Sequence, residues 1–168
     1  MRKLAALVEH ILSVTGIPGE NVAAWAEGGD ARPQGRELAP LWPGEGEEGA
    51  TRRQIELGSF RYDGIVQIER YPGDGAAFVA IITTWLAMCD PDREGLEDPI
   101  LDIELNIRGG DSDVQLSVEF VERLTAVEDP HGIIPFEGRM WSLAPVVAPP
   151  ATTLAMIYGV NKGAGKCR

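Results

Sequence analysis

Apolar and polar residues alternate along several segments of this chain. Within residues 54–71, Phe60, Tyr62, Val66 and Ile68 share one parity, and charged or polar residues take most of the other. A period of two is typical of a strand that has one buried and one solvated face. The sequence therefore predicts extended structure here, either as one strand or as two strands with a break near the middle.

The strongest hairpin pattern lies at residues 101–120, where two alternating runs flank the turn GGDSD. The apolar positions are Leu101, Ile103, Leu105, Ile107, Val114, Leu116, Val118 and Phe120. Asp, Glu, Gln, Asn, Arg and Ser occupy the positions between them. This pattern predicts an antiparallel pair with one apolar and one polar face.

Two segments have the three- and four-residue spacing of helices. Residues 2–15 form an apolar stripe that Gly16 would end, and residues 75–89 form a second stripe after Asp74, a favourable N-cap. We expect both stripes to pack on the apolar face of the hairpin. The predicted core is Leu7, Ile11, Phe78, Ile81, Ile82, Trp85, Leu105, Leu116 and Val118.

These elements predict an α+β fold, with helices on one face of a mostly antiparallel sheet of about four strands. Residues 28–53 are rich in Gly and Pro, and we expect a long exposed loop there. Residues 21–29 are ambiguous between a helix and a strand. We interpret residues 1–145 as one domain. After the Pro-rich break at 145–150, we interpret residues 146–168, which contain LAMIYGV, as a C-terminal arm.

Composition narrows the class of protein. The chain has 168 residues, 44% of them hydrophobic, and a net charge of −11. Such a charge argues against a free-standing nucleic-acid binder, which needs a basic patch, but it is compatible with DNA that slides past. No apolar run approaches the ~20 residues that span a bilayer, so we expect no membrane partner.

One set of acidic residues is a candidate metal-binding or catalytic site. It comprises Asp98, Asp102, Glu104, Asp111 and Asp113. Clustered carboxylates can bind Mg²⁺ or serve in acid–base catalysis, which would make the chain a metal-dependent hydrolase. The alternative is a solvated strand face and an Asp-rich turn, and turn chemistry alone explains these residues.

No nucleophile–base pair or phosphate loop is evident in the sequence. We therefore expect no catalytic residues, no metal and no cofactor, and we interpret the chain as an assembly protein rather than an enzyme. The two cysteines, Cys89 and Cys167, have no framework spacing, which favours free thiols.

Tryptophans in Gly- and Pro-flanked segments are candidate interface anchors, because Trp is enriched at interface hot spots. The alternative is satellite packing beneath loops. The interface candidates are Trp42, Arg52, Arg53, Trp141, Leu154, Ile157 and Tyr158.

Three stretches carry a family resemblance: RYDGIVQIERYPGD, FVAIITTWLAMCDPD and ILDIELNIRGGDSDVQLSVEFVERLTA. In order, they are an aromatic-led strand, a helix ending in Trp-Leu and two alternating strands. This arrangement resembles that of the tail completion protein R family of contractile-tailed phages. AAWAEGGDARPQG resembles a short strand and polar turn of that family, which favours a strand at 22–28. The long GEGEEG loop and the LAMIYGV arm depart from the family pattern.

The resemblance implies a tail terminator without catalytic residues. Its α+β subunits would form a homo-oligomeric ring of about six copies at the head-proximal end of the virion tail. The ring would stop polymerisation of the tail tube and sheath and present a joining surface to a neck or head-completion protein. Assembly would take place in the host cytoplasm, and DNA would pass through the lumen without specific binding. Another phage neck or baseplate adaptor is the alternative function.

Overall fold

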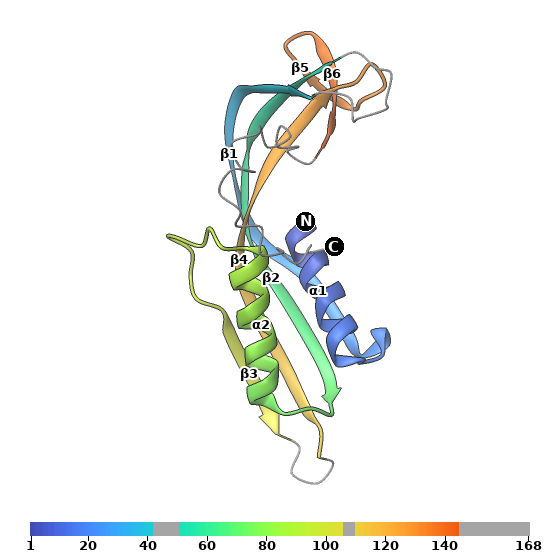
Figure 1. Cartoon of the computed structure of the whole chain (residues 1–168), viewed down its shortest axis with the longest axis vertical. Coiled ribbons are helices and arrows are strands. Elements are labelled where there is room, and N and C mark those ends of the chain that lie inside the picture. The colour runs from blue at the N-terminus through green and yellow to red at the C-terminus, as the bar shows by residue number, and fades with distance from the viewer. Residues whose placement is uncertain (42–50, 106–109, 145–168) are drawn as a thin grey trace, which may run out of the picture. The chain divides into compact units, whose positions relative to one another are not determined.

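The computed structural model describes residues 1–41, 51–105 and 110–144. The described residues form two helices, a 3₁₀ turn and six strands, and Figure 1 labels the helices and strands. In chain order these are α1 (Arg2–Thr15), the 3₁₀ turn (Gly19–Asn21), β1 (Val22–Leu41), β2 (Arg52–Tyr71), α2 (Gly75–Cys89), β3 (Ile100–Leu105), β4 (Ser112–Glu128), β5 (Ile134–Phe136) and β6 (Arg139–Leu143).

All six strands belong to one sheet. Its order is β1-β2-β4-β6-β5, and β3 also pairs with β4. The pairings β3–β4, β4–β6 and β5–β6 are antiparallel. The predicted α+β class is therefore confirmed, as is the predicted hairpin, in which Leu101 lies opposite Leu116 and Ile103 opposite Val114. The expected number of strands, about four, is too low.

The expected loop over residues 28–53 is wrong for residues 28–41, which continue β1, and for residues 52–53, which begin β2. Gly and Pro misled the prediction here. Pro is tolerated in an edge strand, because its missing N–H can be on the side that faces away from the sheet. Gly28, Gly29 and Gly35 have positive φ angles of 63°, 139° and 73°, which lets the strand bend while it stays paired with β2.

The chain divides into two compact units. Unit 1 contains Met1–Asp30 and Arg61–Glu122. The described part of unit 2 contains residues 31–41, 51–60 and 123–144. The long strands β1, β2 and β4 contribute residues to both units.

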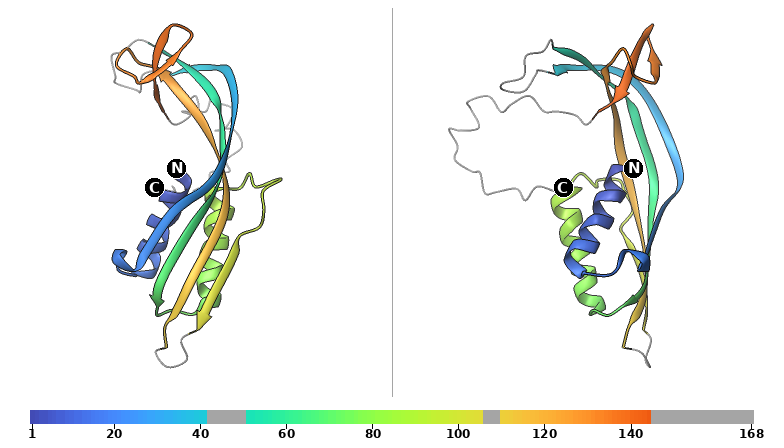
Figure 2. Two further views of the ribbon diagram at one scale, coloured as in Figure 1. Left: turned by 180° about the vertical axis from the view of Figure 1, so that it is seen from behind. Right: turned by 90° about the vertical axis from the view of Figure 1, so that its right-hand side faces the viewer.

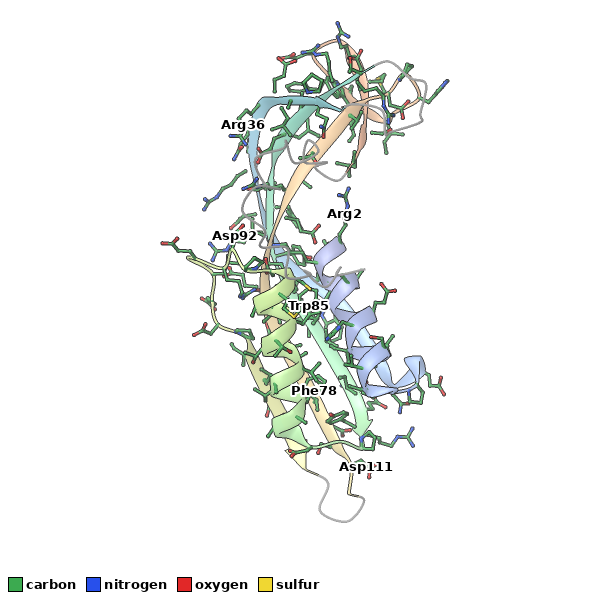
Figure 3. All side chains as sticks on the ribbon, viewed as in Figure 1. Arg2, Arg36, Phe78, Trp85, Asp92 and Asp111 are labelled. Carbon is green, nitrogen blue, oxygen red and sulfur yellow. The ribbon has the colours of Figure 1, made fainter. Side chains whose placement is uncertain are left out.

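Unit 1 has two layers, with α1 and α2 on the same face of the sheet (Figure 2). The alternating side chains of β2 and β4 point into this layer and are buried there. Phe120 lies at the centre, with its ring centroid 5.7 Å from that of Tyr62 and 6.4 Å from that of Trp85. Phe78 and Trp85, labelled on α2 in Figure 3, are both buried.

Most of the predicted core residues are buried: Leu7, Ile11, Phe78, Ile82, Trp85, Leu116 and Val118. Ile81 is half-buried on α2. The side chain of Leu105 lies outside the described part of the structure.

The helix ends follow from local chemistry. Gly16 adopts a left-handed conformation (φ 67°), and its N–H donates to the Leu12 carbonyl at 3.1 Å, so α1 ends as predicted. At the start of α2, the Asp74 carboxylate accepts the Ala76 N–H at 2.8 Å, as an N-cap residue does. None of the described helices is long and apolar enough to cross a membrane.

Unit 2 has its own small core. Ile55, Ala126 and Trp141 are buried together, and Leu57, Ile134 and Phe136 pack against them. The short strands β5 and β6 bring Trp141 opposite Ile134. The sequence did not predict these two strands, because three- and five-residue strands leave too little alternation to detect.

Candidate assembly surfaces

A carboxylate at the start of α1 fixes this helix to the sheet. Glu122, on β4, accepts hydrogen bonds from the Tyr62 hydroxyl at 2.5 Å and from the Lys3 backbone N–H at 3.0 Å. The first N–H groups of a helix have no partner within the helix, and the helix dipole favours an anion there. Met1, the N-cap residue, provides no side-chain cap, so Glu122 supplies this role from another element.

The surroundings of Glu122 set its charge. Burial alone would raise the pKa of this carboxyl, but hydrogen bonds from Tyr62 and from the backbone N–H groups of Arg2 and Lys3 outweigh burial and lower the pKa. Burial, followed by the bond to Glu122, raises the pKa of the Tyr62 hydroxyl. The pair is therefore a neutral donor and a charged acceptor at neutral pH.

Substitution of Glu122 by Gln is expected to destabilise the protein by about 1–2 kcal/mol at pH 7, because bonds to a charged acceptor become bonds to a neutral one. A lowered folded-state pKa contributes stability that is present above the unfolded value, about 4.3, and is lost as pH falls. The unfolding free energy of E122Q should therefore fall less steeply than that of the wild type between about pH 6 and pH 3. Urea denaturation across this range, with the exposed Glu69→Gln as control, measures the difference; equal slopes for wild type and E122Q would contradict this role.

A second ionic cluster joins α1 to the loop after α2. The buried Asp90 carboxylate lies 2.5 Å from Lys3 Nζ and 3.0 Å from Arg93 Nη1. Arg93 also donates to the carbonyls of Glu119 at 3.1 Å and Glu97 at 2.9 Å. These bonds hold the loop against β4, so the cluster serves to join elements of unit 1.

The acidic set lies mainly on the strands. Asp102 and Glu104 of β3 are opposite Gln115 and Asp113 of β4, and with Gln67 these side chains line a hollow of about 210 Å³. Asp113 also accepts the Arg70 backbone N–H at 2.9 Å. Within residues 1–41, 51–105 and 110–144, no group of three or more His, Cys, Asp or Glu side chains is arranged to hold a metal ion.

Asp111 lies in the turn just before β4 (Figure 3) and does not line this hollow. The structure thus places Asp102, Glu104 and Asp113 on a polar strand face, whereas Asp111 lies in the turn and Asp98 lies in the loop before β3.

The interface candidates of unit 2 have different environments. Arg52 is exposed at the start of β2. Arg53 pairs with Glu37 at 2.9 Å and lies 5.9 Å from the centre of the Trp141 ring. Trp141 is 0% exposed, and its indole N–H donates to the Phe136 carbonyl at 3.1 Å. Trp141 is therefore not exposed in the structure, because β5 and β6 place its ring in the core of unit 2.

The remaining candidates, Trp42, Leu154, Ile157 and Tyr158, lie outside the described residues. Cys89, expected to be a free thiol, is disulfide-bonded in the structure, so that prediction is wrong. The other cysteine of the chain, Cys167, also lies outside the described residues.

An apolar groove follows the flank of α1 beside β1. Its volume is about 400 Å³, and it is lined by Met1, Leu4, Ala5, Val8, Glu9, Leu12 and Ala24. The apolar stripe of α1 is wider than the sheet covers, since Leu4, Leu7 and Ile11 are buried while Val8 and Leu12 remain half-buried. The sequence predicted that this stripe packs on the apolar face of the hairpin, with Leu7 and Ile11 in the core, but it did not predict the groove along the flank of α1.

The chain is similar to phage proteins. The sequence model of the family described as P2 phage tail completion protein R matches residues 1–145. The chain is also 27% identical over 122 residues to an uncharacterized 19.2 kDa protein in the rep-hol intergenic region of Haemophilus phage HP1 (strain HP1c1). The aligned region covers 70% of this chain and 66% of that relative. No solved structure matches the chain.

Proposed function

This chain belongs to the P2 phage tail completion protein R family, and from this premise we propose that it is a tail terminator. Family membership gives the chain a structural role in completing a bacteriophage tail, in association with other tail components. The proposal is finer: about six copies form a ring at the head-proximal end of the tail. The ring stops polymerisation of the tube and sheath and presents the surface to which the neck or head-completion protein binds.

The observation that carries the proposal is the family match over residues 1–145, which includes both units of the described structure. The architecture supports it. A ring closes through heterologous contacts, in which one surface of a subunit meets a different surface of the next. In unit 1 the edge strand β1 and an apolar groove lie side by side. Within the described part of the chain, no further strand pairs with the outer edge of β1, so a partner could bind there.

Charge is consistent with a ring around DNA. The net charge of −11 gives little attraction for phosphate. A lumen lined by acidic subunits would let DNA pass without specific binding, and a ring structure with a strongly basic channel would contradict this part of the proposal. Location in the virion tail follows from the family; the head-proximal end and assembly in the host cytoplasm are part of the proposal.

Removal of this chain from the phage that encodes it tests the function. Electron microscopy of the resulting particles should show overlong tails that carry no heads, because nothing stops tube growth or joins the tail to the neck. Tails of normal length with a defect at the distal end would instead identify a baseplate adaptor and contradict the proposal.

A further inference from the structure

The first residues of β1 are an unprotected sheet edge. β1 is the terminal strand of the sheet in the described structure, paired with β2 alone. Half of its backbone N–H and C=O groups therefore point away from the sheet. Natural edge strands are usually guarded by Lys, Pro, charged side chains or bulges, but residues 22–26 are Val-Ala-Ala-Trp-Ala. Residues that protect an edge come later in β1, where the positive φ angles of Gly28 and Gly29 bend the strand and Pro33 lacks an N–H.

The apolar groove lies on the helix side of this edge. Ala24 lines the groove together with α1, so Ala24 faces the helix layer, and by alternation Val22 and Ala26 face it too. These side chains are small and leave Val8 and Leu12 of α1 half-buried. A strand added outside β1 would place every second side chain in the groove and bury this flank of α1.

The chain contains an apolar segment that fits such a place. The described residues end at Ala144, and the sequence beyond it has one run of suitable length, LAMIYGV at residues 154–160. In an extended conformation Leu154, Met156, Tyr158 and Val160 share one face. At up to about 3.3 Å per residue, residues 145–153 could extend at most roughly 30 Å beyond Ala144.

We propose that residues 154–160 of a neighbouring copy add a strand to the β1 edge at residues 22–27, with the Leu154/Met156/Tyr158/Val160 face in the α1 groove. The inference rests on the proposed ring. The donor arm and the acceptor groove are different surfaces, so their contact is heterologous and repeats around a closed ring. Backbone hydrogen bonds to the edge supply affinity, and the groove supplies specificity for alternate side chains.

Residue-resolved hydrogen exchange on the full-length, assembled protein tests this contact. In the wild type, the amides of residues 22–27 that point away from β2 should exchange slowly. Met156→Asp places a charge in the apolar groove, which is costly, and should speed exchange of these amides by at least about tenfold. Ala155→Asp, on the opposite face of the arm, is the matched control and should leave their exchange unchanged. Amides that bond to β2 report the integrity of the sheet and should stay protected in all three proteins.

Light scattering on the same samples identifies the copy that donates the arm. Met156→Asp should shift the assembly towards the monomer, while Ala155→Asp should not. Fast exchange of the outward amides in the assembled wild type, or equal exchange in the wild type and Met156→Asp, overturns the inference. Protection that persists in a monomeric sample also overturns it, since the arm would then come from the same chain. If phage carrying Met156→Asp still makes tails of normal length joined to heads, this result contradicts the proposed arm contact but leaves the proposed terminator function unaffected.

Discussion

Substitution of Phe120 by Ala is expected to lower the free energy of unfolding by about 3–5 kcal/mol. Phe120 is 0% exposed and stacks at an angle against Tyr62 on one side and Trp85 on the other. Gly64 lies directly beside the ring, where a Cβ would come within 2.8 Å of it. The phenyl ring therefore fills space between the sheet and both helices, and its removal leaves a cavity that the surrounding layers can only partly close.

Urea denaturation followed by tryptophan fluorescence measures this loss. Met88→Ala is the control, because Met88 lies on α2 in the same unit but is 64% exposed, and its substitution should change stability by less than about 0.5 kcal/mol. A loss below about 1 kcal/mol for Phe120→Ala would mean that unit 1 does not depend on this packing.

Substitution of Trp141 by Ala is expected to cost about 3–5 kcal/mol in the stability of unit 2. Trp141 is the largest side chain of a small core that includes Ile55 and Ala126, and its indole satisfies the Phe136 carbonyl. Its loss removes both the packing and a buried hydrogen bond. In the sequence the same residue was equally consistent with an interface anchor, so the substitution separates the two interpretations.

The measurement is denaturation of the Trp141→Ala protein at a concentration where the subunits are dissociated, with Met140→Ala as control. Met140 is adjacent on β6, is 38% exposed and points to the other face. Unchanged subunit stability together with lost assembly would contradict the core role and make Trp141 an interface residue. A single transition that shifts as a whole would support the proposed single domain at 1–145, whereas a separate early transition for unit 2 would contradict it.

The elements that the sequence predicted well are those in which local pattern and tertiary burial agree. The stripe of α2 and the alternation in β4 both follow the faces that are buried, and Gly16 and Asp74 end or begin helices through bonds within a few residues. Such features need no information from distant segments. The loop prediction for residues 28–41 was wrong for the opposite reason. Their composition is typical of a loop, but they form a strand because they pair with β2.

The polar network at the start of α1 was missed, although one signal was present. Glu122 has the parity of Val118 and Phe120, so an acidic residue occupies a position on the buried face of β4. A charge at such a position requires a partner. Its partners, Tyr62 and the start of α1, lie far from it in the sequence. The pattern of apolar and polar residues in a single sequence does not identify such distant partners. The groove beside β1 was missed because its existence depends on which strand lies at the sheet edge.

The central claim, that this chain stops tail growth at the head-proximal end, is tested most directly by the length distribution of tails in lysates of the phage without the chain. Negative-stain electron microscopy should show a broad distribution of tails longer than those of the wild type, without attached heads. Expression of the wild-type chain from a plasmid should restore both the uniform length and the joined particles. Tails of wild-type length joined to filled heads in the absence of the chain would contradict the account.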